Sequence, residues 1–140
     1  MYLLDTDHLT VLERGGEESR RLLSRLENTE PDETAVTIIT YEEQTRGWFA
    51  YLAKARSPEA VLKAYQLLHK HLETFCTIPV VEYDEKAAEA FRNLQGQRLL
   101  IGTMDLKIAA IAIARDATLL TRNLADFNQI HGLHAEDWTI

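Results

Sequence analysis

Short apolar runs alternate with helical patterns along this chain, and this alternation restricts the fold more than any other feature of the sequence. Apolar or β-branched runs predict five strands, at residues 2–5, 34–39, 78–83, 118–121 and 133–140. Helical patterns fall between them, at residues 8–14, 17–30, 40–55, 58–75, 85–95 and 104–116, with a helical fragment within 123–130. Strands separated by helices predict an α/β fold with a mostly parallel sheet covered on both faces, and we expect one domain over residues 1–140.

Composition excludes several other classes of protein. Hydrophobic residues make up 46% and charged residues 26% of the chain, which is ordinary globular usage and argues against disorder. A net charge of −7 opposes non-specific binding of nucleic acid by the protein as a whole. No apolar run approaches the ~20 residues of a membrane span, and no basic leader precedes the first strand, so we expect a cytoplasmic protein without a membrane partner.

The only cysteine, Cys76, excludes a disulfide within one chain and is consistent with a reducing compartment. Its apolar neighbours predict a small buried side chain rather than a nucleophile.

Acidic and amide side chains stand at corresponding places in the alternation. Asp5 ends the first strand, and Glu43 lies in the predicted first turn of the helix after the second strand. Asp105 lies in the first turn of the most apolar helix, and Asn123 and Asp126 follow the fourth strand. Because parallel strands end at one edge of a sheet, where ligands bind in such folds, we expect these groups to converge.

Carboxylates gathered at one edge repel one another and need a cation to neutralise them. A set of oxygen ligands without nearby His or Cys favours a hard divalent ion, Mg²⁺ or Mn²⁺. Such an ion polarises a phosphodiester and lowers the pKa of a bound water. The sequence therefore favours hydrolysis of a phosphodiester, with RNA as the substrate.

Several of these residues also have ordinary structural interpretations. Asp7 is predicted to be the N-cap of the first helix, which leaves Asp5 without a local role and favours a functional one. Glu43 equally fits a capping box with Thr40, and Asp126 fits a turn-stabilising acid. The histidines show no ligand spacing and are interpreted as surface or core residues.

The same motifs resemble the PIN-domain ribonucleases of the VapC toxin type. The resemblance covers the whole chain and is carried by LLDTD, TIITYEEQTRG, IGTMDLKIAAIAIA and LLTRNLADF, in this order. It implies a PIN-like three-layer α/β/α domain with a sheet of four to five strands. It also implies a metal-dependent endoribonuclease that uses Mg²⁺ or Mn²⁺, a homodimer, and an antitoxin protein that occludes the site.

Carried over by residue, the acids of the family fall on Asp5, Glu43 and Asp105, which the resemblance implies hold the metal ion. At the fourth position many relatives have an acid, whereas this chain has Asn123. Asn adds no negative charge, so either Asn123 or Asp126 orients the attacking water.

Two further groups of residues are expected to assist the metal ligands. Side chains that hold the metal ligands in place are expected at Thr6, Asp7 and Thr121. Phosphate contacts are expected at Arg46, Arg98 and Arg122, for which pairing with surface acids is an equal alternative.

Two other functions fit parts of the sequence. The strand followed by Asp5-Thr6-Asp7 resembles the nucleophile loop of haloacid-dehalogenase-type phosphatases, although the later acids stand in first turns of helices. Asn123 also fits a catalytically degenerate PIN domain that binds a partner without cutting RNA.

The helical segment 41–72 carries more aromatic side chains than one core stripe requires, namely Trp48, Phe49, Tyr51 and Tyr65. We interpret this group mainly as core, with a surface for dimerisation or an antitoxin as the alternative.

Overall fold

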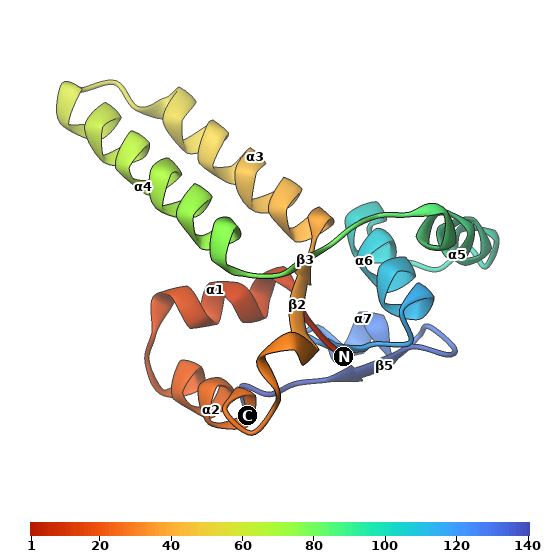
Figure 1. Ribbon diagram of the computed structural model, residues 1–140. Coiled ribbons are helices and arrows are strands. Elements are labelled where there is room, and N and C mark those ends of the chain that lie inside the picture. The colour runs from red at the N-terminus through yellow and green to blue at the C-terminus, as the bar shows by residue number, and fades with distance from the viewer.

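A central parallel sheet organises the computed structural model, which describes all residues from Met1 to Ile140 (Figure 1). The strands are β1 (Tyr2–Leu4), β2 (Thr34–Thr37), β3 (Val80–Val81), β4 (Thr118–Leu120) and β5 (His134–Glu136). They are ordered β3-β2-β1-β4-β5, and every neighbouring pair is parallel. The α/β prediction is therefore confirmed, with β5 as the predicted edge strand.

Helices surround this sheet on both faces. They are α1 (Thr6–Arg14), α2 (Glu17–Leu26), α3 (Ile38–Lys54), α4 (Pro58–Thr77), α5 (Glu85–Gly96), α6 (Thr103–Ala114) and α7 (Leu124–Phe127), with a 3₁₀ turn at Pro31–Glu33. In Figure 1, α1 and α2 lie on one side of the sheet and α5 and α6 on the other, while α3 and α4 form a projecting hairpin. No helix combines the length and apolar character that crossing a membrane requires.

Alternation along the strands divides the core into two layers. Leu3 and Leu119 face a cluster that includes α5 and α6, whereas Leu4 and Leu120 face a cluster that includes α1 and Trp138. Helix α6 is buried from Leu106 to Ala112 almost without interruption, as its all-round apolar sequence predicts. This helix therefore holds its N-terminal Asp105 in a fixed place beside the sheet.

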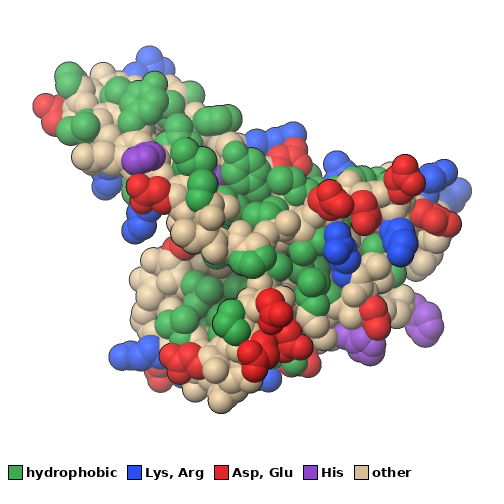
Figure 2. Space-filling model, viewed as in Figure 1, with side chains coloured by type: hydrophobic (Ala, Val, Ile, Leu, Met, Phe, Trp, Pro, Cys, Tyr) green, Lys and Arg blue, Asp and Glu red, His purple; other side chains and the backbone are tan.

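The hairpin is far more exposed than its sequence predicts. Of its two helices only Ile39, Thr40, Ala64 and His71 are buried. Phe49 and Tyr65 are each 56% exposed and Leu62 is 61% exposed, so the interpretation of the aromatic group as core is wrong for these positions. Figure 2 shows the resulting apolar surface along the projecting helices. Cys76, predicted to be buried, is also exposed near the end of α4.

Two helices begin earlier than the sequence predicts. The N-cap of α1 is Asp5, whose carboxylate accepts the Thr6 N–H, so the prediction that Asp7 caps this helix is wrong. The N-cap of α3 is Thr37, whose hydroxyl accepts the Thr40 N–H, so the capping box with Glu43 is also wrong. In both cases the strand ends sooner than its apolar run. The cap is the residue just after β1 in the first case and the last residue of β2 in the second.

The chain direction across the sheet reverses at β1. From β1 the chain proceeds to β2 and β3 on one side, and it returns to β4 and β5 on the other. The carboxyl ends of β1 and β4 are thus the point where the connections diverge, which is where open α/β sheets bind ligands. Asp5 follows β1 at this point, and Thr121 follows β4.

Candidate active site

Asp5 lies at the point of divergence and is only 5% exposed. Its Oδ1 accepts the Thr6 N–H at 2.8 Å, and its Oδ2 accepts the hydroxyl of Thr121 at 2.9 Å. The backbone N–H of Asp5 donates to the carbonyl of Leu120 at 2.9 Å, which ties the ends of β1 and β4 together. The side chain is therefore fixed by both central strands.

The pKa of Asp5 is raised to about 7. Burial is the largest cause, followed by the negative charge of Asp7, with Asp105 contributing in the same direction. Hydrogen bonds from Thr121 and Thr6 act oppositely but do not compensate. A carboxylate in this position is poorly stabilised near neutral pH by the protein alone, and a nearby cation would stabilise it.

Glu43 approaches the same place from the second turn of α3. Its Oε1 accepts the hydroxyl of Thr6 at 3.0 Å, which links it to the residue after Asp5. Burial raises its pKa most, and the charges of Asp105 and Glu42 raise it further. Glu42 instead pairs with Arg46 at 2.6 Å on the surface, so Glu43 is the acid of α3 that belongs to the site.

Asp105 lies in the first turn of α6, as predicted, and is half-buried. Burial is the first cause of its raised pKa, followed by the charges of Asp126 and Asp7. The charge of Asp105 thus raises the pKa values of both Asp5 and Glu43, which come from two other segments. All three residues line one cavity, although Asp5 and Asp105 are far apart in the sequence.

These acids open onto one cavity of about 440 Å³, which we call the acid cavity. It is lined by Asp5, Thr6, Asp7, Thr10, Val11, Arg14, Glu43, Asp105, Arg122 and Asn123. No three His, Cys, Asp or Glu side chains come close enough to ligate a single ion as they stand. The donor set nevertheless fits a hard divalent cation, because it consists of oxygens whose charges are unfavourable without one.

The two candidates for the fourth position lie together. The Nδ2 of Asn123 donates to Oδ2 of Asp126 at 2.9 Å, and only Asn123 lines the acid cavity. Asp126 still acts on the cavity through its charge, which raises the pKa of Asp105. Asn123 therefore faces the cavity, and Asp126, which is not part of the cavity lining, holds its amide through this hydrogen bond.

Asp7 supports the loop after β4 rather than capping a helix. Its Oδ2 accepts the backbone N–H of Arg122 at 3.0 Å and lies 3.4 Å from the hydroxyl of Thr121. The Asn123 N–H in turn donates to the Thr121 hydroxyl oxygen at 3.0 Å. Thr121 is completely buried, so its hydroxyl has a fixed direction towards Asp5.

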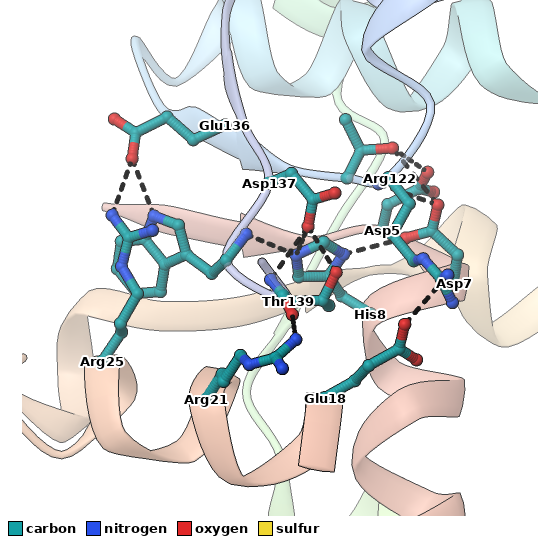
Figure 3. A network of polar contacts seen from close by, with 12 residues as sticks. Asp5, Asp7, His8, Glu18, Arg21, Arg25, Arg122, Glu136, Asp137 and Thr139 are labelled. Carbon is teal, nitrogen blue, oxygen red and sulfur yellow. Dashed lines mark hydrogen bonds and ion pairs between the residues drawn. The ribbon is translucent and has the colours of Figure 1, made fainter.

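Behind Asp7 is a buried polar group that we call the His8 cluster, comprising His8, Asp7, Asp137, Trp138 and Thr139 (Figure 3). His8 is completely buried, its Nδ1 lies 3.0 Å from Asp7 Oδ1, and its Nε2 accepts the Trp138 N–H at 3.1 Å. Because a backbone N–H can only donate, Nε2 is unprotonated and Nδ1 donates to Asp7. His8 is then neutral, and its 3.6 Å approach to Asp137 is no ion pair.

Sequence reasoning placed the cationic groups less well than the acids. Arg46 pairs with Glu42, Arg98 lies in the exposed turn after α5, and neither lines the acid cavity. Arg122 does line it, although its guanidinium pairs with Glu18 at 3.2 Å. Arg14 also lines the cavity and was missed.

The spacing of residues along α1 indicates that Arg14 lies on the same side of the helix as Asp7. Asp7, Thr10 and Arg14 stand three and then four residues apart, which places them on one face of α1. All of them line the acid cavity.

This chain is similar to known proteins over nearly its whole length. The PIN domain family matches residues 2–133. Ribonuclease VapC1 of Haemophilus influenzae (strain R2866) is 29% identical over 144 residues, covering 99% of this chain and 98% of that protein. Ribonuclease VapC2 of Rickettsia felis is 35% identical over 65 residues, or 44% of this chain and 48% of that protein.

Solved structures show the same similarity. The structure of VapBC-1 from nontypeable Haemophilus influenzae aligns with a TM-score of 0.70 at 26% identity, covering 99% of this chain and 98% of that one. The crystal structure of FitAcB from Neisseria gonorrhoeae aligns with a TM-score of 0.73 at 20% identity, with the same coverage, and supports the shared fold alone.

Proposed function

Because this chain belongs to the PIN-domain family, we propose that it is a metal-dependent endoribonuclease and the toxin of a cytoplasmic toxin–antitoxin pair. The observation that carries the proposal is the acid cavity, where carboxylates from three segments meet at the reversal point of a parallel sheet and each has a raised pKa. The similar proteins named ribonuclease VapC give the substrate class. We also propose that residues 1–140 form one PIN-like domain.

Asp5, Glu43 and Asp105 are the residues that would hold Mg²⁺ or Mn²⁺. When bound, the ion supplies positive charge against the phosphodiester and makes a water molecule more acidic. The hydroxyls of Thr121 and Thr6 direct the carboxylates of Asp5 and Glu43, respectively. These hydrogen bonds keep the ligand oxygens in place before an ion arrives.

The remaining polar groups act on the water and the phosphate. Asn123, fixed by Asp126, orients the water whose oxygen bonds to phosphorus. This water loses a proton to solvent, the phosphorus–oxygen bond to the leaving nucleoside breaks, and the leaving oxygen takes up a proton from solvent. Arg14 and Arg122 line the same cavity and contact the phosphate oxygens.

The decisive test compares Asp5→Asn with Asp116→Asn. Asn keeps the N-cap of α1 but removes the charge, so cleavage of labelled RNA with Mg²⁺ or Mn²⁺ should fall by about 100-fold or more. Asp116 is exposed before β4, at the opposite edge of the sheet, and its positive φ of 49° tolerates Asn. Asp116→Asn should cleave like the wild type. Equal activity in both variants would contradict the site.

The same assay separates the other two functions. A small phosphomonoester, tested beside RNA, should remain intact. Turnover of the monoester alone would favour a phosphatase of the haloacid-dehalogenase type. RNA binding without cleavage, under any metal tested, would favour a degenerate PIN domain, which the neutral Asn123 allows.

We further propose that the exposed apolar side chains of the hairpin contact partners, namely a second copy of this chain and an antitoxin. Phe49, Leu62 and Tyr65 are each more than half exposed, which is costly for a free surface in water. Similar solved structures include VapBC-1 from nontypeable Haemophilus influenzae and a toxin-antitoxin complex from Klebsiella pneumoniae. A Phe49→Ser, Tyr65→Ser double variant should sediment as a monomer and lose the antitoxin, while a monomeric wild type would contradict the dimer.

A further inference from the structure

A second cavity, of about 490 Å³, lies between α1 and the hairpin. It shares Thr10 and Arg14 with the acid cavity, so the two cavities adjoin along α1. We call it the hairpin cavity, and its volume is within the range of small-molecule sites. Nothing in the proposed hydrolysis uses it.

Two polar atoms in the wall of the hairpin cavity have no hydrogen-bond partner. They are Oε1 of Gln44 and Nδ1 of His71, and both are shut off from solvent. Each such atom destabilises the folded protein when it is left unpaired. The protein itself therefore leaves two hydrogen-bonding groups unused in this wall.

His71 is held in one orientation, which makes its free nitrogen a directed group. The residue is 5% exposed, and its Nε2 lies 2.8 Å from the hydroxyl of Thr45. Tyr41 stacks on its ring at 5.6 Å, and Phe75 meets the ring edge-on at 4.8 Å. Burial lowers the pKa of His71, so the ring is neutral and Nδ1 offers a single donor or acceptor.

Aromatic and cationic side chains complete the cavity. Trp48 and Tyr51 of α3 meet edge-to-face with ring centroids 5.8 Å apart, and both line the cavity. Lys70 lies near Glu13, whose pKa it lowers against the larger effect of burial. Arg14, at the junction of the two cavities, has no ion pair.

We propose that the hairpin cavity binds one base of the RNA strand next to the scissile phosphate, with Arg14 on the phosphate between them. This inference rests on the proposed nuclease function. A base has flat apolar faces for Trp48 and an edge of donors and acceptors for Gln44 and His71. Arg14 is exposed at the junction without an ion pair, so its guanidinium is free to bind an anionic link between the contents of the two cavities. An RNA strand provides that link, whereas a peptide backbone is neutral.

The test uses a single-stranded RNA whose cleaved bond has been mapped, together with copies that carry an abasic nucleotide on either side. For the wild type, one abasic position should raise KM about 10-fold, the size of a lost stacking contact. Gln44→Leu should raise KM for intact RNA and abolish the difference between intact and abasic RNA. Because it removes an unpaired buried oxygen, it should not lower the urea midpoint.

Gln66→Leu is the matched control, since Gln66 is exposed on α4 outside the cavity. It should behave as the wild type with both RNAs. The proposal is overturned if no abasic position changes KM, or if Gln44→Leu still discriminates between the two RNAs. It is also overturned if Gln44→Leu weakens antitoxin binding and leaves KM unchanged, because the cavity then holds a protein side chain.

A binding measurement separates this inference from the nuclease proposal. Oligo(U) and oligo(A) are titrated into the Asp5→Asn protein, and Trp fluorescence is compared with that of Asp5→Asn, Trp48→Phe. Quenching that depends on Trp48 supports the cavity even if no RNA is ever cleaved, in which case only the nuclease proposal fails. If the wild type cleaves RNA but no such quenching is seen, the proposal that the hairpin cavity binds a base is overturned, and the nuclease proposal stands.

Discussion

The acid cavity and the His8 cluster lie on either side of Asp7, and they differ in whether their buried polar groups have partners. In the His8 cluster each buried donor has an acceptor: His8 donates to Asp7 and accepts from Trp138, and the Thr139 N–H donates to Asp137. In the acid cavity, Asp5, Glu43 and Asp105 are half-buried or buried, and none of them forms an ion pair.

The difference distinguishes the part of the molecule that supports the fold from the part that is ready for a ligand. A fully paired buried group contributes to stability, whereas an unbalanced acid reduces it and is tolerated for another reason. Substitutions in the two regions should therefore change stability with opposite signs. Each of the following predictions tests that contrast.

The largest effect is expected from the pH dependence of Asp5→Asn. Because the pKa of Asp5 is raised from 3.8 to about 7, the folded state binds this proton more tightly than the unfolded chain. The wild type therefore loses stability as pH rises from about 4 to 7, by up to about 4 kcal/mol. Asp5→Asn lacks this loss, so its free energy of unfolding should exceed that of the wild type above pH 7.

Urea unfolding of both proteins at pH 5 and pH 8, with EDTA, measures this difference. Mg²⁺ or Mn²⁺ should stabilise the wild type at pH 8 and leave Asp5→Asn unchanged. If the wild type is more stable than Asp5→Asn at pH 8 without metal, the protein itself stabilises the negative charge of Asp5, and the contrast is contradicted.

In the His8 cluster, His8→Leu should destabilise the protein by about 3 kcal/mol, because it leaves both Asp7 and the Trp138 N–H without their partner. His8→Asn places an amide N–H near the position of Nδ1 and should recover part of the loss. Urea unfolding at pH 7 compares the three proteins. If His8→Leu proves as stable as the wild type, the contrast between the two regions is lost.

Thr121→Val tests the boundary between the two regions. It leaves Asp5 Oδ2 without a donor and the Asn123 N–H without an acceptor, at a cost of about 2 kcal/mol. It should also raise the pKa of Asp5 further, because the Thr121 hydrogen bond lowers it. Thermal unfolding against pH checks both effects, and Thr118→Val, on the half-buried start of β4, is the control.

The smallest effect is expected from Asn123→Asp, which adds the acid missing from the fourth position. Two carboxylates would then replace the Asn123–Asp126 hydrogen bond, at a cost of about 1 kcal/mol without metal. The variant should bind Mn²⁺ more tightly than the wild type in a calorimetric titration. Unchanged affinity for Mn²⁺ would mean that position 123 is remote from the ion.

The sequence was sufficient to predict the strands, the central helix α6 and the gathering of Asp5, Glu43 and Asp105 at one edge. These depend on strong local patterns and on the general geometry of parallel sheets. The functional interpretation of Asp5 was nevertheless based partly on a wrong premise, since Asp5 does have a capping role. Which residue caps a helix depends on where the strand before it stops pairing, and the apolar run does not reveal that.

Contacts between distant segments were beyond sequence reasoning. His8 and Trp138 are 130 residues apart, so no spacing rule connects them. The exposure of Phe49 and Tyr65 was equally hidden, because helical periodicity indicates a face but not what covers it. The hairpin projects from the sheet, and only the assembled structure shows that these faces lack a covering element.

Asp5 begins α1 and faces the acid cavity with the same side chain. A lineage that abandoned catalysis would thus have few neutral ways to alter this position, because most replacements would weaken the start of the helix at the same moment. Asn and Ser are the exceptions, since they cap about as well as Asp does. A silenced descendant of this chain should therefore carry Asn or Ser here far more often than chance, and it should retain the shape of its active ancestor.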